Sequence, residues 1–441
     1  MNLYNEFDDD VYDDSPIDCS RYMRTHRRRK RATLVAMLIV LAYMAKKQKI
    51  AARRSRCRFL KRAELMPAPR TESPWQAIFR SREDRAFITT MGMNVATFDF
   101  ILDHGFRATW IAHTIPREDV NPQGLTCPGR RSLDAEGALG LLLHYLSGTM
   151  GETTLQQVFA LVPSVIAHYI KFALGIMLAV LRYLPDGKIT WPNAEKMREY
   201  SDAIHSRHPA ITGAFGFLDG LSLPVSTSSD PAIKKATYNG WLHAHKISNI
   251  LVFAPDGTII AAKINAPGSW HDSRVATHIY KNLIERTDEG FFLIADTAFP
   301  RNGHQISSKI KTPFKTNHRF PDGTTREAAT NAMEYSHAIT SARQAAEWGM
   351  RALQGSFARL RMPLDINDSA GRKVLIETCI RLHNLRTRRI AINQITTVYS
   401  RHMQQWGSNE EDFFERLHAT LFPEIRRADR INQFYRQLRY I

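Results

Sequence analysis

Apolar residues at helical spacing dominate residues 76–205. Within Asp134 to Ser147 they recur three or four positions apart, as on one face of a helix, at Leu139, Leu142, Leu143 and Leu146. A short helix is expected over 154–160. A long helix is expected to begin at Pro163-Ser164, with Ser164 as N-cap, and to end near Tyr183.

The last two of these helices are joined by a tight turn. Two helices in this arrangement resemble a helix-turn-helix, in which the second helix enters a groove of DNA. Here the second helix is apolar rather than basic. Two alternatives therefore stay open for residues 76–205: a helix-turn-helix-like domain, or a helical domain whose helices serve packing.

Beyond residue 210 the pattern changes to short apolar runs, which predict strands, alternating with longer helical stretches. A turn signal at Pro255-Asp256-Gly257 joins two of the strands into a hairpin. The expected elements are strands over 215–225, 245–253, 258–264 and 290–295, and helices over 270–286 and 329–361. This order is typical of an α/β domain. We predict an RNase H-like mixed sheet over 211–390, preceded by a helical N-terminal region and followed by a helical C-terminal extension over 391–441.

Residues 1–75 differ from the rest of the chain in charge, and we expect them to form a disordered, basic arm that contains one short apolar helix. Residues 21–62 hold sixteen Lys or Arg and no Asp or Glu, and the whole chain has a formal net charge of +17 and a pI of about 9.8. Such a block is typical of a solvated arm, a nuclear-import signal or a DNA contact. The charge favours a polyanionic partner, nucleic acid before membrane. We expect a nuclear protein that acts on DNA.

An apolar segment, residues 32–45, interrupts the basic block. Its 14 residues fall short of the roughly 20 that span a bilayer. Basic residues flank it on both sides and no small-residue cleavage site follows, which argues against a secretory signal. We predict a helix that is buried or binds a partner, with no membrane contact. A membrane anchor is the alternative.

Three acidic residues stand in settings typical of metal ligands. Asp219 and Asp296 each end a short apolar run, as carboxylates at strand ends do, and Glu347 lies in a helical stretch. Carboxylates from two strand ends and a helix can hold two divalent ions, Mg²⁺ or Mn²⁺, for in-line attack on a phosphodiester. The four cysteines show no CxxC spacing, so a zinc site is not indicated. We predict a metal-dependent DNA endonuclease or strand-transfer enzyme.

Five short motifs surround these acids in one order. They are Phe217-Leu218-Asp219-Gly220, Pro267-Gly268-Ser269-Trp270-His271-Asp272-Ser273-Arg274, Ala295-Asp296-Thr297-Ala298-Phe299-Pro300, Arg343 to Glu347 with Leu353, Gly355 and Phe357, and Leu382-His383-Asn384. With this order and spacing, residues 211–385 resemble the DDE domain of the PIF/Harbinger transposase-derived nucleases. The segment from about 130 to 210 is similar to the helical region that precedes that domain.

The resemblance implies a set of roles and partners. Asp219, Asp296 and Glu347 would be the catalytic acids and metal ligands, with DNA as the substrate. A separate Myb-like DNA-binding protein would be a partner. The sequence indicates no particular oligomeric state.

Asp272 competes with Asp296 as the second catalytic acid. We prefer Asp296 because it directly follows a buried run, a frequent place for ligands in α/β sheets. His271 and Asp272 are then auxiliary residues that brace the next helix or orient a metal ligand. Arg343 lies one helical turn before Glu347. It is expected to orient that carboxylate, to touch a phosphate, or to form a surface ion pair.

The motifs depart from the family pattern at three positions. Alanine stands at 295 and 298, where the family has glycine, and Arg351 replaces a small residue. None of these changes removes an acid. They keep open a second function, that of a domesticated transposase-derived DNA-binding protein without cleavage activity.

Overall fold

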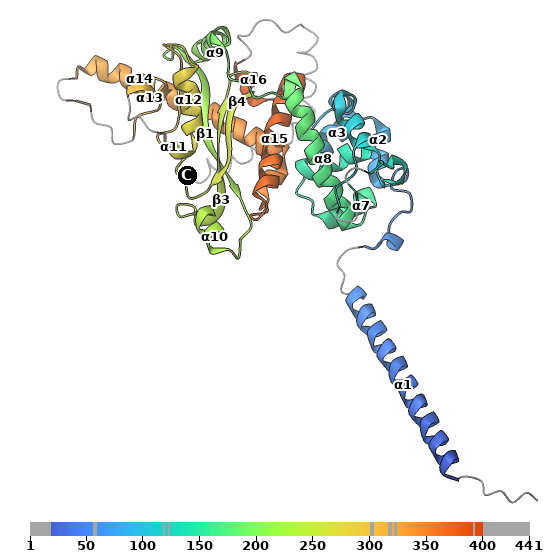
Figure 1. The fold of residues 1–441 in the computed structure, drawn as a ribbon. Helices are drawn as coiled ribbons and strands as arrows, with labels where there is room; N and C mark the ends of the chain where they lie inside the picture. Colours follow the sequence, from blue (N-terminus) through green and yellow to red (C-terminus); the bar gives the residue numbers. More distant parts are fainter. Residues whose placement is uncertain are drawn as a thin grey trace, which may run out of the picture. The chain divides into compact units, whose positions relative to one another are not determined.

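The computed structural model describes residues 19–55, 60–117, 120–121, 124–299, 304–315, 320–321, 324–390 and 393–399. The chain divides into two compact units, residues 1–60 and 61–441 (Figure 1). The expected C-terminal extension over 391–441 lies outside the described residues, except for 393–399.

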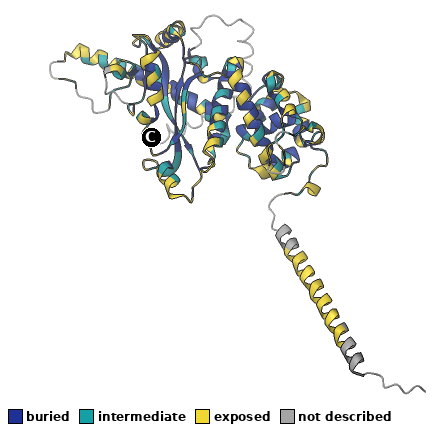
Figure 2. Ribbon diagram, viewed as in Figure 1, coloured by how far each residue is buried: buried dark blue, intermediate teal, exposed yellow. Residues whose placement is uncertain are grey.

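The first unit contains one long helix, α1, which runs from Cys19 to Ser55. It includes the predicted helical segment 32–45. The nine large apolar side chains between Leu34 and Met44 are 55–67% exposed. Figure 2 colours the described part of α1 as exposed. Burial of this segment is therefore not observed, and binding to a partner stays a prediction.

The second unit begins with helices and short 3-10 turns that form a helical layer. Its helices are α2 (Pro74–Ser81), α3 (Asp84–Met91), α4 (Val95–Ile101), a π-helical turn (Leu102–Phe106), α5 (Arg107–Ala112), α6 (Ala135–Ser147), α7 (Glu152–Phe159), α8 (Pro163–Tyr183) and α9 (Ala194–Arg207). The 3-10 turns are Arg62–Glu64, Pro128–Arg130 and Pro185–Gly187. The helices predicted at 134–147, 154–160 and 163–183 are confirmed. Ser164 is not the N-cap of α8: Val162 is, because Pro163 takes the first helical position.

Helix α8 serves packing. It packs against α6 and against the later helix α15 (Ser369–Ile390), and ten of its residues are buried. By length and composition α8 is also apolar enough to cross a membrane, a test that a core helix passes as well. These contacts favour the helical packing domain over a groove-reading helix.

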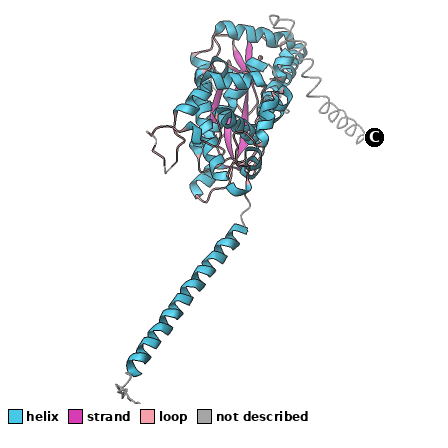
Figure 3. Cartoon of the chain, turned by 90° about the vertical axis from the view of Figure 1, so that its right-hand side faces the viewer, coloured by secondary structure: helices cyan, strands magenta, loops and turns pink. Residues whose placement is uncertain are grey.

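A six-stranded mixed sheet follows (Figure 3). Its strands are β1 (Ala214–Pro224), β2 (Tyr238–Asn239), β3 (Ala244–Phe253), β4 (Ile259–Pro267), β5 (Phe292–Ala295) and β6 (Ile310–Lys311). The order is β4-β3-β1-β5-β6, with β2 paired to the start of β3. Strands β1, β3 and β4 pair antiparallel, and β5 and β6 join in parallel to β1. The predicted hairpin and the RNase H-like mixed sheet are confirmed.

Helices cover both faces of the sheet. They are α10 (Pro231–Thr237), α11 (Asp272–Val275), α12 (Thr277–Glu285), α13 (His304–Ser307), α14 (Arg326–Ser356) and α16 (Gln394–Tyr399), with α15 and a 3-10 turn at Ala358–Arg361. On one face α14, α15 and α16 join the core of the helical layer; on the other, α9, α11 and α12 enclose a second core. The helix predicted over 270–286 is two short helices that meet at Ala276.

Asn384 of α15 ties the sheet to the helical layer. Its side chain is fully buried, accepts from the backbone N–H of Ile259 at 2.7 Å, and donates to the carbonyls of Ile259 at 2.8 Å and Lys188 at 3.1 Å. These hydrogen bonds stabilise the fold. If the Asn384 amide were removed, the buried backbone groups that it pairs with would lose their partner, at a cost of about 1–3 kcal/mol each. This contact gives a structural reason for the Leu382-His383-Asn384 motif.

Candidate active site

The parallel pairing of β1 with β5 brings Asp219 and Asp296 to one place. The last paired residues on these strands are Leu218 and Ala295, and each acid is the next residue along its own strand. Adjacent strands lie about 4.8 Å apart, so the two acids start from neighbouring backbones. Side chains alternate along a strand, and Leu218 belongs to the core that α9, α11 and α12 enclose, so Asp219 points toward the opposite face, which α14 covers.

Helix α14 brings Glu347 and Arg343 to the same face. The Arg343 guanidinium lies 2.8 Å from the Glu347 carboxylate and 3.7 Å from the Asp219 carboxylate. The Arg343 side chain is 23% exposed and that of Asp219 is 20% exposed. The sequence predicted the contact with Glu347 one turn away, but it carried no signal for the long-range contact with Asp219.

Asp219 has a strongly perturbed pKa. The pKa of Asp219 is raised to about 6, with burial as the largest cause. The Gly220 N–H at 2.8 Å and the charge of Arg343 lower the pKa, and the charges of Asp296 and Glu347 raise it. The structure therefore brings the three predicted acids within electrostatic reach of one another. Perturbation of this kind is typical of functional sites.

Asp272 lies on the other side of β1. A Cβ built on Gly220 would stand 2.8 Å from the Asp272 carboxylate, and residue 220 faces away from the side of residue 219. Burial raises the pKa of Asp272; the charge of His271 lowers it, and that of Asp296 raises it. Asp272 thus neighbours Asp296 from the α11 side. Gly220, whose role the sequence did not reveal, leaves the space for it.

His271 begins α11 with its backbone. Its carbonyl accepts from the backbone N–H groups of Arg274 at 2.9 Å and Val275 at 3.2 Å, and its side chain caps no N–H group. The expected bracing of the next helix is therefore made by the main chain of His271. Its ring acts on Asp272 through charge.

The acidic side chains fit a divalent metal by their chemistry but not by their present spacing. Among the described residues, no three His, Cys, Asp or Glu side chains lie close enough to hold one ion. The charges of Asp296 and Glu347 nevertheless act on Asp219, and Arg343 pairs with Asp219 and Glu347. By chemistry the set fits a hard cation, because Mg²⁺ and Mn²⁺ prefer carboxylate oxygens. Closer approach of these side chains would be needed to coordinate an ion.

The three departures from the family motifs leave these acids in place. Ala295 is fully buried in β5, paired with Leu218, and Ala298 and Arg351 are exposed. Neither alanine has a positive φ, so the backbone needs no glycine there.

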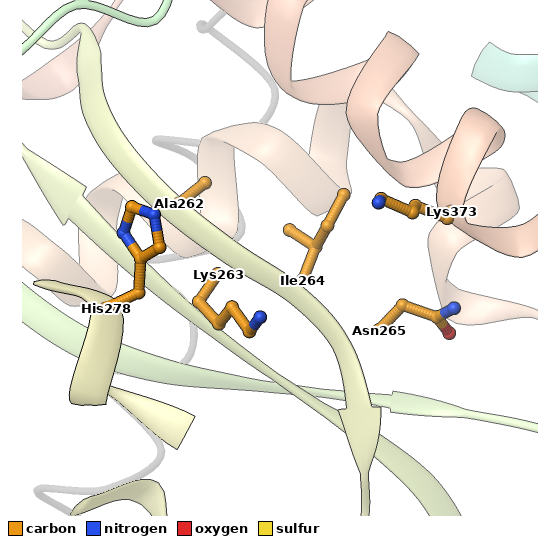
Figure 4. A pocket seen from close by; sticks show the side chains of 6 residues that line it. All are labelled: Ala262, Lys263, Ile264, Asn265, His278 and Lys373. Carbon is orange, nitrogen blue, oxygen red and sulfur yellow. The ribbon is translucent and has the colours of Figure 1, made fainter. Parts of the chain in front are cut away.

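A hollow of about 370 Å³ lies away from the acids, at the edge strand β4. Figure 4 shows its lining from β4, α12 and α15: Ala262, Lys263, Ile264, Asn265, His278 and Lys373. No carboxylate lines it. Its basic side chains make it unsuited to holding a metal ion.

The mixed sheet is consistent with an RNase H-like DDE domain. Asp219 lies in the middle of β1 rather than at a strand end, Asp296 directly follows β5, and Glu347 lies on α14. Residues 218–384 match the family model described as DDE superfamily endonuclease. At the level of this domain, the match is consistent with the PIF/Harbinger resemblance. No curated protein and no solved structure gave a match to the chain.

The raised pKa of Asp219 predicts a pH-dependent gain in stability for Asp219→Asn. The folded state keeps a proton that the unfolded state releases between about pH 4 and 6, so wild-type stability falls as pH rises through this window. Asparagine does not titrate. Without divalent metal, the variant should exceed wild type in free energy of unfolding by about 1–3 kcal/mol at pH 8, and the difference should shrink toward pH 4.

Chemical denaturation of both proteins at several pH values measures this difference. Asp202→Asn, an exposed acid on α9, is the matched control and should show no such trend. A difference between Asp219→Asn and wild type that stays constant from pH 4 to 8 would contradict the assignment.

Proposed function

We propose that this chain is a metal-dependent DNA endonuclease or transposase that cleaves phosphodiester bonds. The observation that carries the proposal is geometric: the Arg343 guanidinium lies 3.7 Å from the Asp219 carboxylate and 2.8 Å from that of Glu347. Asp219 and Asp296 follow the last residue pair of β1 and β5. The match of residues 218–384 to the endonuclease family supports it. Nothing in the structure favours the alternative of a DNA-binding protein without cleavage.

In this proposal Asp219, Asp296 and Glu347 hold Mg²⁺ or Mn²⁺, as two ions. When bound, the metals lower the pKa of an attacking water or 3′-hydroxyl and stabilise the leaving oxygen. The chain's own groups orient the ligands: the N–H of Gly220 holds the Asp219 carboxylate, and the N–H of Thr297 holds that of Asp296 at 2.7 Å. No nucleophilic side chain is required.

Arg343 has two parts in the proposal. Its guanidinium balances the charge of Asp219 and Glu347, which limits the cost of burying the Asp219 carboxylate. With a divalent cation bound, the carboxylates would no longer need the guanidinium as their counter-charge, and the planar donors of Arg343 would suit a phosphate of the DNA. The residue thus serves the site in both states.

We further propose that the protein acts in the nucleus. The basic block of residues 21–62, most of which lies on α1, would serve nuclear import and contact DNA phosphates. A separate Myb-like partner, as the family resemblance implies, would supply sequence specificity.

Purified protein with Mg²⁺ or Mn²⁺ should cut DNA that carries the terminal repeats of its element. Asp219→Asn and Glu347→Gln should each lower the cleavage rate by roughly 100-fold or more, because even outer partners of a metal ligand are worth 10- to 100-fold. Gel assays of nicked and cut DNA measure the rates. Asp202→Asn should cut at the wild-type rate, and equal cutting by Asp219→Asn would show that the activity comes from another site or a contaminant.

The basic block should make DNA binding strongly salt-dependent. Each phosphate contact contributes about 0.9 to the slope of log affinity against log salt. Replacing the five cations of residues 27–31 with glutamine should therefore flatten the slope by up to about 4.5. Deleting residues 1–60 should flatten it further and abolish nuclear import. Binding titrations at several salt concentrations and imaging of the tagged chain measure the two effects.

The matched control is Arg326→Gln, a single exposed cation on α14. Its slope should change by no more than about 1. If deletion of residues 1–60 leaves the slope unchanged, the phosphate contacts lie in the second unit and the role given to α1 is wrong.

A further inference from the structure

The turn between β2 and β3 displays large apolar side chains to solvent. Trp241 is 91% exposed, Leu242 45% and Tyr238 44%. Trp270, just before His271, is a further exposed aromatic at 36%. We call Tyr238, Trp241, Leu242 and Trp270 the aromatic surface. Indole and phenol rings are among the most favourable groups to bury, so their exposure at one end of a domain calls for a binding partner.

The turn holds Trp241 in place by specific hydrogen bonds. The Asn239 side-chain carbonyl accepts from the backbone N–H groups of Trp241 at 3.1 Å and Leu242 at 3.0 Å, which forms an Asx-type turn. His243 follows with a φ of 49°, a left-handed conformation that costs energy in a non-glycine residue. The turn that exposes Trp241 therefore contains a strained residue, His243.

This turn is fastened to the motif that contains Asp272. The Asn239 amide donates to the Gly268 carbonyl at 3.1 Å, and the Ser269 N–H donates to the Ala236 carbonyl at 3.1 Å. Gly268 approaches so closely that a Cβ there would stand 2.1 Å from the Lys246 carbonyl oxygen. Contacts of this kind hold the β2–β3 turn and the Trp270 segment as one surface.

The strand register relates this surface to the candidate active site. On β3, Leu251 pairs with Asp219, and Ala244, the first residue after the turn, lies seven residues away. At about 3.3 Å per residue, the turn lies some 23 Å from Asp219 along the strand. Trp270 is two residues from Asp272. The aromatic surface therefore extends from beside Asp272 to the start of β3, where Figure 1 shows α10.

Cations accompany the aromatic rings. The Arg274 guanidinium lies 4.0 Å from the centroid of the Trp270 ring, and Lys234 and Lys235 of the neighbouring α10 are exposed. From residue 231 to residue 270 the sequence contains one acid, Asp256, at the opposite end of β3. Aromatic rings interleaved with cations match a strand of nucleic acid, since bases stack on the rings and phosphates meet the charges.

We propose that the aromatic surface stacks on unpaired bases of the DNA substrate, with Trp241 as the main platform. The inference rests on the proposed function, since it assigns the surface to the same DNA that the carboxylates would cleave. The ligand class is a single-stranded stretch at a DNA end or at an opened site. The exposed cations of α10 favour this polyanion over an apolar protein partner.

Binding of two DNA molecules by the full-length protein tests the proposal. One is a blunt, fluorescein-labelled duplex; the other is the same duplex with an eight-nucleotide single-stranded overhang. Fluorescence anisotropy with EDTA present measures Kd without cleavage. Wild type should bind the overhang DNA more tightly than the blunt DNA. Trp241→Ala should weaken overhang binding about tenfold, which is about 1.4 kcal/mol, and change blunt binding less than twofold.

Three further variants sharpen the result. Trp241→Phe should restore most of the overhang affinity because it keeps a stacking face, whereas Trp241→Leu should behave like Trp241→Ala. Tyr183→Ala, which removes an 84% exposed aromatic side chain from α8, should bind both DNA molecules as wild type does. Thermal unfolding of each variant checks the fold.

Several results would overturn the proposal. The first is that the wild-type protein binds both DNA molecules with the same Kd. The second is that Trp241→Ala weakens binding to both equally, and the third is that Trp241→Leu binds the overhang DNA as tightly as wild type. Unchanged DNA binding by Trp241→Ala would instead point to a protein partner for the turn. Metal-dependent cleavage of the blunt duplex is scored separately, so loss of the proposed function and loss of base stacking give different outcomes.

Discussion

The parallel register of β1 and β5 is the constraint on which the candidate active site depends. Leu218 and Ala295 form the last pair, and this places Asp219 and Asp296 side by side just beyond it. Because side chains alternate along a strand, a slip of one residue would move either acid to the opposite face. The apolar runs before both acids fix the register, since burying them in the two cores allows one alignment.

Helix α14 completes the site because small residues let it lie close to the sheet. Ala342, Ala345 and Ala346 are fully buried, and a Cβ on Gly349 would stand 2.5 Å from the Phe253 ring. This close packing brings Arg343 and Glu347 to Asp219. Burial disfavours the charged form of Asp219, whose pKa is raised to about 6, and a nearby cation would stabilise that charged form. Packing and electrostatics thus point to the same chemistry.

Much of this architecture could be predicted from local patterns. The turn at Pro255-Asp256-Gly257 predicted the β3–β4 hairpin, and the apolar spacing predicted α6 and α8. The helix over 270–286 was wrong in part, because the chain bends at Ala276 after a single turn. Asp219 and Asp296 stood out by their positions after apolar runs, whereas Glu347 lay in a helical stretch and was singled out by the motif around it.

The remaining features depend on contacts between distant residues, which spacing does not encode. They include the approach of Arg343 to Asp219, the space that Gly220 leaves for Asp272, and the display of Trp241 by Asn239. The apolar segment 32–45 shows the same limit. Its helical form could be predicted from the spacing of its apolar residues. A partner surface for its exposed side chains could not, because such a surface lies outside the helix.

The central claim is that Asp219, Asp296 and Glu347 form one site for a divalent metal. Anomalous diffraction from crystals soaked in Mn²⁺ tests it most directly, because the signal locates the ion without assumptions about activity. The account predicts Mn²⁺ at coordination distance from the Asp219 carboxylate, shared with Asp296 or Glu347, with Arg343 turned away. Mn²⁺ bound at Asp272 without Asp219, or no Mn²⁺ at these acids at saturating concentration, would contradict it.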